Sequence, residues 1–286
     1  MQYANLSSFM RDGKAALAKG PVALIMIEDD VEVRSTIDHH LRHGFRAVVA
    51  FADADIPMPD ALDPQVHWVT HDMSGDAALE TAVNSVIKAM PGQWLYYCYN
   101  SEYLHYPYCE DRTIGELLSF NAEERRETVL CYAIDLYPGE LENAPEAVSL
   151  EDAYLDTTGY YALARWNGTD YEDRQLDFFG GLRWRYEEYI PWTRRRIDRV
   201  GLFRARAGLQ LRPDHTFNIP EYNTYACPWH NNITATICSF RTAKALKRNP
   251  GSRTAIHDFR WRASTRFNWT SSQLMDLGLM EPGQWF

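Results

Sequence analysis

Apolar positions in the first hundred residues follow two different patterns. Runs that are apolar at nearly every position, with β-branched or aromatic members, predict buried strands at 21–27, 45–51, 66–69 and 93–99. Two segments, 31–44 and 76–90, instead carry apolar residues at helical spacing and are closed by Gly or by Pro-Gly. The order strand, helix, strand, strand, helix, strand predicts an α/β fold with a mostly parallel sheet and flanking helices.

The later part of the chain has weaker patterns. We expect helices at 113–120, 122–127 and 234–247, a strand at 129–136, an acidic loop with a short helix at 138–156, a hairpin or strand at 201–211, and a short helix within 267–286. No internal repeat or low-complexity linker interrupts the chain. We therefore expect a single domain over 1–286, with a core at about 20–245 and a C-terminal extension at 246–286.

Polar residues follow two of the predicted strands directly. Residues 28–30 (EDD) come after the first strand, and residues 100–102 (NSE) come after the fourth. In a parallel α/β sheet, ligands bind in a crevice beyond the carboxyl ends of the strands. The sequence therefore predicts that both clusters face one crevice.

Composition narrows the classes of partner. A formal net charge of −10 argues against nucleic acid, which requires a dominant basic surface. Arginines are nevertheless concentrated at 194–212, which fits a solvated face, a diphosphate, an anionic glycan or a membrane surface. The 17 Tyr and 9 Trp suit stacking on sugars or bases, although half-buried core is the commoner explanation.

Cysteine usage and hydropathy indicate the compartment. The five cysteines are far apart and form no Cys-x-x-Cys pair, so a reducing cytoplasm is the simplest location. Residues 1–20 contain no apolar run of signal-peptide length, and no segment approaches the roughly 20 apolar residues of a spanning helix. We expect a cytoplasmic protein without a transmembrane segment, and peripheral membrane contact remains open.

Several segments match a known order of motifs. The strand and acidic residues 25–30 precede His39–Phe45, and Tyr99–Leu104 occupies the position of an Asp-x-Asp-Glu-Phe-Leu motif, with both aspartates missing. The remaining elements follow in order: Gly180-Gly181 with Arg183, Arg199–Arg204, Asp214-His215 and Trp229–Asn232. Over roughly residues 20–245 the chain resembles the bacterial family-two glycosyltransferases, especially the branch related to the eukaryotic family ninety-two enzymes. The order of the motifs carries this resemblance more than any single motif does.

The resemblance implies a GT-A-like fold and a specific activity. The expected function is sugar transfer from a nucleotide-sugar donor to a glycan or small-molecule acceptor, in polysaccharide biosynthesis, with Mg²⁺ or Mn²⁺ bound. At the degenerate Asp-x-Asp position the metal ligands would be Asn100, Ser101 and Glu102, with His230 completing the set. This set has one carboxylate where hard cations usually have more.

The other implied roles concern the donor and the acceptor. Nucleotide-sugar-binding residues would be Glu28, Asp29 and Asp53 for the base and ribose, with Arg183, Arg199 and Arg204 for the diphosphate. An inverting transfer also needs a general base. The candidates for it are Asp214 and Glu221.

Two alternatives remain open. Because both aspartates are missing, the chain could be a non-catalytic relative that binds a glycan, a nucleotide or a protein partner. A hydrolase with a pair of carboxylates is the other alternative. The sequence has no Gly-x-Ser-x-Gly elbow and no Gly-rich phosphate-binding loop, which disfavours serine hydrolases and P-loop enzymes.

Overall fold

The computed structural model describes residues 1–224 and 232–285. Contacts between Cα atoms divide the chain into two compact units, each assembled from several segments. Unit 1 comprises Met1–Ser101, Asp111–Val129 and Val200–Asn223, and unit 2 comprises Glu102–Glu110, Leu130–Arg199 and Thr224–Phe286. Each unit is described by itself.

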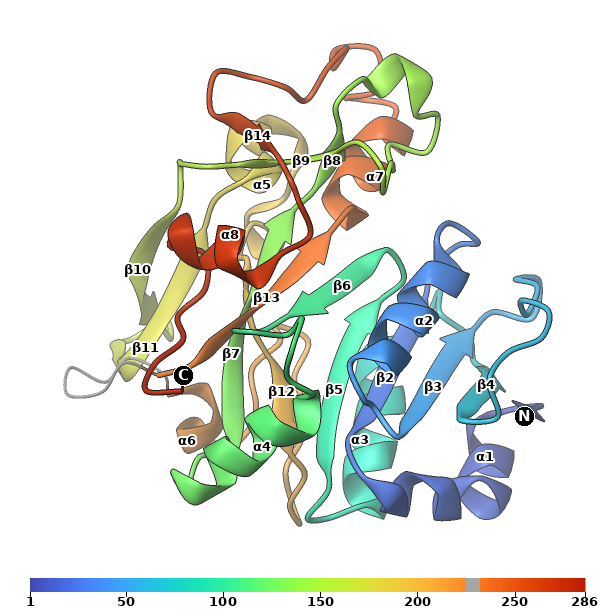
Figure 1. The fold of residues 1–286 in the computed structure, drawn as a ribbon. Coiled ribbons are helices and arrows are strands. Elements are labelled where there is room, and N and C mark those ends of the chain that lie inside the picture. Colours follow the sequence, from blue (N-terminus) through green and yellow to red (C-terminus); the bar gives the residue numbers. More distant parts are fainter. Residues whose placement is uncertain (225–231, 286) are drawn as a thin grey trace. The chain divides into compact units, whose positions relative to one another are not determined.

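Unit 1 contains the regular βα pattern of the N-terminal half (Figure 1). Its strands are β1 (Gln2–Tyr3), β2 (Val22–Ile27), β3 (Ala47–Ala52), β4 (Val66–Thr70), β5 (Trp94–Tyr99) and the second part of β12 (Asp198–Arg204). Its helices are α1 (Leu6–Asp12), the 3₁₀ helix η1 (Lys14–Lys19), α2 (Val33–Arg42), α3 (Ala78–Ala89), α4 (Ile114–Glu123) and α6 (Pro220–Asn223).

The strands of unit 1 are buried on both faces. β1, β4, β3, β2 and β5 pair in parallel in that order, and β12 pairs antiparallel with β5. Every residue of β2 and β3 is buried, as expected for parallel strands covered by helices on both sides. The crossovers through α2 and α3 run in opposite directions along the sheet, so right-handed connections place these helices on opposite faces.

Unit 2 combines sheet strands with smaller β structures (Figure 1). Its strands are β6 (Glu102–His105), β7 (Thr128–Asp135, from Leu130), β8 (Tyr137–Pro138), β9 (Ala153–Asp156), β10 (Tyr161–Trp166), β11 (Tyr171–Phe179), β13 (Thr234–Ser239) and β14 (Ser264–Arg266). Its helices are α5 (Leu182–Arg185), α7 (Arg241–Arg248) and α8 (Ser271–Asp276), with short 3₁₀ helices η2 (Leu141–Asn143), η3 (Glu187–Tyr189) and η4 (Trp192–Arg194).

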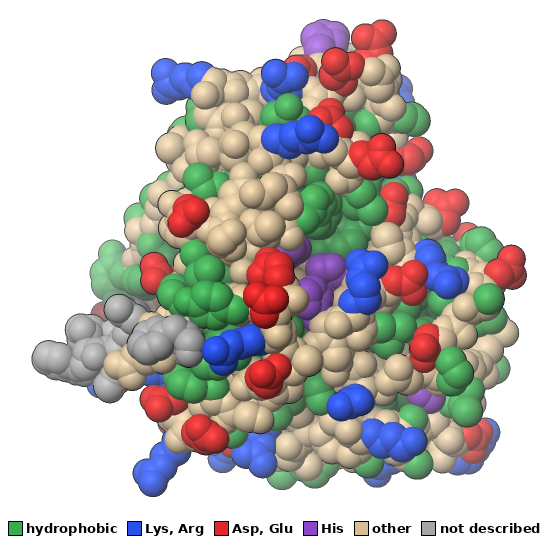
Figure 2. Space-filling model, in the orientation of Figure 1, with side chains coloured by type: hydrophobic (Ala, Val, Ile, Leu, Met, Phe, Trp, Pro, Cys, Tyr) green, Lys and Arg blue, Asp and Glu red, His purple; other side chains and the backbone are tan. Residues whose placement is uncertain are grey.

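Within unit 2, β13 pairs in parallel with β7 and antiparallel with β6. β8, β9 and β14 form a small antiparallel sheet, and β10 and β11 form a hairpin. Figure 2 shows hydrophobic side chains at the surface over this hairpin. The core of the unit instead gathers apolar side chains from β7, β9, β13 and α8.

The strands pair in the order β1-β4-β3-β2-β5-β12-β7-β13-β6. The fold is therefore α/β, with a nine-stranded mixed and largely parallel sheet flanked by helices. This confirms the predicted fold class, whereas the assignment to a GT-A-like fold and to a single domain stays a prediction.

Three segments have a secondary structure that differs from the one predicted from the sequence. The helix predicted at 234–247 is wrong in its first half, because Thr234–Ser239 is the buried strand β13 and only Arg241–Arg248 is helical. The two helices predicted at 113–127 are one helix, α4, which begins at a capping box formed by Thr113 and Glu116. The 201–211 segment is a strand only as far as Arg204.

The described cysteines are Cys98, Cys109, Cys131 and Cys238, and all of these are buried. Cys227 lies outside the described residues. Within 1–224 and 232–285, no helix has the length and apolar content needed to cross a bilayer.

Burial of His105 gives a testable pH dependence. Its ring is buried beside Phe267 and Trp269, and burial lowers its pKa from 6.5 to about 4. The folded state therefore holds this ring neutral while the unfolded state takes up a proton. We expect about 3 kcal/mol of stability to be lost as the pH falls from 6.5 to 4. Urea unfolding across this pH range should show the loss, and NMR titration of the ring should give the low pKa.

The variant His105→Gln should flatten this part of the pH profile, since it removes the titrating group. His257→Gln, which changes an exposed side chain, is the matched control and should leave the profile as it is. A profile that is equally steep in wild type and His105→Gln would refute the assignment.

Candidate functional site

Unit 1 has a topological switch point at the carboxyl ends of β2 and β5. The chain continues from β2 to β3 on one side, whereas β5 returns to pair with β2 on the other side. In open α/β sheets, ligands bind beside such a point because the loops after the two strands diverge. The residues that follow β2 and β5 are the polar clusters 28–30 and 100–102.

Asn100 holds these two strand ends together. Its Oδ1 accepts a hydrogen bond from the backbone N–H of Glu28 at 2.9 Å, and its Nδ2 donates to Oδ1 of Asp29 at 2.6 Å and to the carbonyl of Val31 at 2.9 Å. The side chain of Asn100 is fully buried. The structure therefore brings Asn100 together with Glu28 and Asp29, and the crevice predicted beside these residues stays a prediction.

Strained backbone flanks the same point. Ser101 and Glu32 have positive φ angles of 61° and 55°, a region that few residues other than glycine adopt. Ser101 is held there by its N–H donating to Oγ1 of Thr36 at 2.9 Å and its Oγ donating to Val31 O at 3.0 Å. Strain of this kind concentrates at functional sites.

The carboxylates at this edge differ in exposure. Glu28 is exposed and Asp29 is half-buried, while Asp53, after β3, is half-buried and accepts a hydrogen bond from Met73 N at 2.9 Å. Carboxylates fixed in this way can accept hydrogen bonds from ribose hydroxyls and from the N–H groups of a base. A role of these carboxylates in binding a nucleoside stays a prediction.

Two other predicted residues of unit 1, Arg204 and Glu221, lie away from this edge. Arg204 pairs in register with Trp94 at the opposite end of β5, and its Nε donates to Gly92 O. Glu221 is next to Tyr222, whose hydroxyl bonds to the carbonyl of Arg204. Neither Arg204 nor Glu221 therefore joins Glu28 at the switch point.

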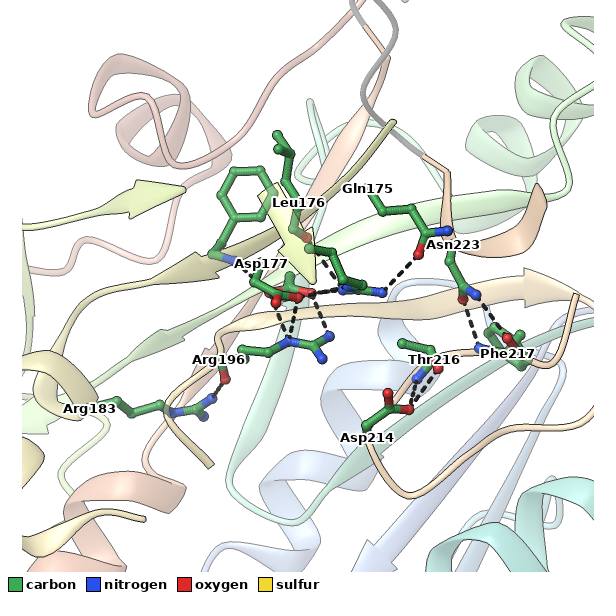
Figure 3. A network of polar contacts seen from close by, with 12 residues as sticks. Gln175, Leu176, Asp177, Arg183, Arg196, Asp214, Thr216, Phe217 and Asn223 are labelled. Carbon is green, nitrogen blue, oxygen red and sulfur yellow. Dashed lines mark hydrogen bonds and ion pairs between the residues drawn. The ribbon is translucent and has the colours of Figure 1, made fainter. Parts of the chain in front are cut away.

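Asp214 belongs to a turn in unit 1. Its Oδ1 accepts hydrogen bonds from the N–H and the hydroxyl of Thr216 at 3.1 and 2.7 Å (Figure 3). His215 stacks on Tyr97, and its ring nitrogen is 3.2 Å from the tyrosine hydroxyl. Asp214 is exposed, so a role as general base stays a prediction.

Unit 2 contains a set of charged and hydroxyl side chains near the ends of β6, β7 and β13. We term this set the arginine–carboxylate cluster, and its members are Glu102, Asp135, Arg183, Arg199, Ser239, Arg241 and Thr242. The strand register aligns Ser239 with both Glu102 and Asp135. The cluster therefore lies at the carboxyl end of the parallel pair β7 and β13.

Glu102 and Arg199 form its first ion pair. The two guanidinium nitrogens of Arg199 donate to the two carboxylate oxygens at 2.8 and 3.0 Å, and Oγ of Ser239 donates to Oε1 at 3.0 Å. The Glu102 side chain is 0% exposed and that of Arg199 is 5% exposed. Such bidentate geometry is the strongest form of this interaction.

Asp135 and Arg183 form the second ion pair. The backbone N–H of Arg183 donates to Oδ2 at 3.3 Å, and Nε lies 3.4 Å from Oδ1. Among the described residues, Oδ1 has no hydrogen-bond partner. Gly181 permits this approach, because a Cβ there would lie 2.9 Å from Oδ2 and its φ is 63°.

Burial dominates the electrostatics of the cluster. It raises the pKa of Asp135 above its usual range, although the charge of Arg183 acts in the opposite direction. Burial also lowers the pKa of Arg183, and repulsion from Arg199 and Arg241 lowers it further, while Asp135 and Glu102 oppose the change. The guanidinium groups of Arg199 and Arg241 and the carboxylates of Glu102 and Asp135 therefore all act on the charge of Arg183.

The predicted metal ligands do not fit a divalent cation well. The oxygen of Asn100 accepts a hydrogen bond from Glu28 N, and the carboxylate of Glu102 is paired with a guanidinium, which repels a cation. A group of three or more His, Cys, Asp or Glu side chains suited to a metal is not found among the described residues. His230 lies outside them, so the metal site stays a prediction.

The sequence identified Arg183, Arg199 and Glu102 as candidates, but it did not indicate that Arg199 and Glu102 form a pair or that Asp135 is the partner of Arg183. Asp135 ends the strand predicted at 129–136, so its position beyond a strand end was a usable signal. Ser239 and Thr242 were hidden because 234–247 was predicted as one helix. Comparison of the chain with models of known protein families and with curated proteins gives no match.

The buried pair can be tested by a double-mutant cycle. Arg199→Met should lower the free energy of unfolding by about 3–5 kcal/mol, because it leaves the Glu102 carboxylate buried without its partner. Adding Glu102→Gln should recover a large part of this loss, and urea unfolding measures both. Asp38→Asn, which breaks the exposed pair with Arg34, is the control and should cost about 0.5 kcal/mol or less. Additive effects of the two cluster variants would refute the coupling.

Proposed function

We propose that this protein is a glycosyltransferase that transfers a sugar from a nucleotide-sugar donor to a glycan or small-molecule acceptor. The observation that carries the proposal is the switch point of unit 1, where Asn100 fixes the loop that presents Glu28 and Asp29. The α/β fold and the ordered resemblance to family-two glycosyltransferases support the same activity.

The switch point accounts for the nucleoside part of the donor. Glu28 and Asp29 accept hydrogen bonds from the base and ribose, and Asp53 contributes a further carboxylate from the end of β3. The internal bonds of Asn100 keep this loop in one conformation before the ligand arrives. Such preorganisation reduces the entropy that binding costs.

Sugar transfer also requires stabilisation of the charge that develops on the leaving diphosphate. The arginine–carboxylate cluster of unit 2 contains three guanidinium groups, and a guanidinium group can bind phosphate oxygens bidentately. This chemistry favours a transfer assisted by arginine over one that depends on Mg²⁺ or Mn²⁺.

A non-catalytic protein that binds a nucleotide or a glycan is the second candidate. It is favoured by the hydrogen bonds of Asn100 and Ser101, two residues of the degenerate motif whose side chains are both bonded within the protein. Such a protein would bind its ligand without turnover.

The two candidates are separated by calorimetric titration with UDP, GDP and uridine, with and without Mn²⁺, followed by a turnover assay with UDP-sugars. We expect nucleotide binding that does not depend on Mn²⁺. The double variant Glu28→Gln/Asp29→Asn should weaken UDP and uridine alike by about tenfold, because it removes charge-assisted hydrogen bonds to the nucleoside.

Glu123→Gln removes a similar charge from an exposed position on α4 and is the matched control, so it should bind as wild type does. Binding that requires Mn²⁺ would refute the arginine-assisted transfer. Binding without turnover would support the non-catalytic candidate, and binding of neither nucleotide would exclude the proposed donor.

A further inference from the structure

Exposed aromatic side chains are concentrated in one stretch of unit 2. The exposed large hydrophobic residues in this stretch are Tyr161, Leu163, Trp166, Tyr171, Trp184 and Trp192. Elsewhere in the described chain, only Met1 and Met58 are comparably exposed. Exposed apolar side chains gathered on one element can mark an interaction site, and four of these residues, Tyr161, Leu163, Trp166 and Tyr171, belong to the β10–β11 hairpin.

The most exposed rings lie at the tip of the β10–β11 hairpin. Trp166 ends β10 and Tyr171 begins β11, and the two residues are paired in register. Their ring centroids are 5.0 Å apart with an interplanar angle of 67°, and the residues are 54% and 64% exposed. The tip therefore presents two rings in a fixed mutual orientation to solvent.

The turn at this tip is held by its own hydrogen bonds. Oδ1 of Asn167 accepts from the N–H groups of Thr169 and Asp170, each at 2.9 Å, and the N–H of Asn167 donates to Asp170 O at 3.0 Å. Nδ2 of Asn167 donates to Oε1 of Glu172 at 3.0 Å. This asparagine-centred turn fixes the strands that carry the rings.

A network of ion pairs also braces the hairpin, and it includes Arg165, the residue directly before Trp166 (Figure 3). Arg165 pairs with Asp177 at 2.8 Å and with Asp198 at 2.9 Å, and Arg196 pairs with the same two aspartates at 3.1 and 2.9 Å. The Asp198 side chain is 1% exposed. The ion pairs thus fix the hairpin, while the rings of Trp166 and Tyr171 at its tip remain mostly exposed to solvent.

The charge around the tip selects among ligands. Asp170, Glu172 and Asp173 are acidic, while Arg174 is the one basic residue between Asn167 and Gln175. This negative balance disfavours nucleic acids and anionic lipids. Aromatic faces with adjoining carboxylate and amide groups suit a neutral sugar, whose C–H face stacks on a ring while its hydroxyls form hydrogen bonds.

We infer that the hairpin tip binds a neutral saccharide chain. The sugar stacks on Trp166 and Tyr171, and its hydroxyls exchange hydrogen bonds with the side chains of Asn167 and Glu172. The identification of this saccharide as part of the glycan acceptor rests on the proposed function. The binding site itself involves the residues of unit 2 alone.

The test uses the full chain and five uncharged probes: cellohexaose, maltohexaose, laminarihexaose, xylohexaose and mannohexaose. We expect at least one to bind in calorimetry and to perturb tryptophan fluorescence. The variant Trp166→Ala/Tyr171→Ala should weaken this binding by about tenfold or more, because aromatic anchors dominate binding energy. Trp192→Ala, at a residue that is 58% exposed, is the matched control and should bind as wild type does.

Nucleotide titrations of the same variants separate this inference from the proposed function. Saccharide binding without nucleotide binding would support the saccharide site at the tip but would refute its role as an acceptor site. Nucleotide binding with no response to any probe would overturn the tip site alone. Self-association in sedimentation that Trp166→Ala/Tyr171→Ala abolishes, without saccharide binding, would overturn it in favour of a contact between two copies.

Discussion

The constraint on which unit 1 depends is the burial of its parallel strands on both faces. Every position of β2 and β3 is removed from water, so neither strand can carry a polar side chain along its length without a large penalty. The first positions at which polar groups are tolerated are those just beyond the strand ends. Glu28, Asp53 and Asn100 occupy such positions. The location of the candidate chemistry is therefore a consequence of how the core is built.

The same constraint explains why position 100 is Asn rather than Asp. A fully buried amide needs partners for both of its groups, and Asn100 accepts from Glu28 N while donating to Asp29 and Val31. An aspartate would lose both donated bonds and would place a second carboxylate next to that of Asp29, which like-charge repulsion opposes. Asn100 is thus part of a complete hydrogen-bond network that a carboxylate at the same position would break.

Continuous apolar runs were sufficient to predict β2, β3, β4 and β5, and the rule that ligands bind at strand ends then identified Glu28, Asp29 and Asn100. Prediction failed where a strand is followed by a helix with no Gly or Pro to mark the boundary. β13 is separated from α7 by Phe240 alone, so the whole segment was predicted as one helix. The ion pair of Glu102 could not be predicted either. Its partner, Arg199, is 97 residues away in the chain, and no local pattern encodes that contact.

Charge in unit 2 is arranged differently from charge in unit 1. A buried ion pair seldom stabilises a fold more than apolar residues of the same volume would, so stability alone is a weak reason to retain two of them. Burial lowers the pKa of Arg183, and repulsion from the guanidinium groups of Arg199 and Arg241 lowers it further. An anion bound to the arginine–carboxylate cluster would offset that repulsion, and by linkage it would stabilise the folded state in the same measure as the cluster favours the anion. Binding of an anion at this cluster would therefore appear as an increase in the free energy of unfolding.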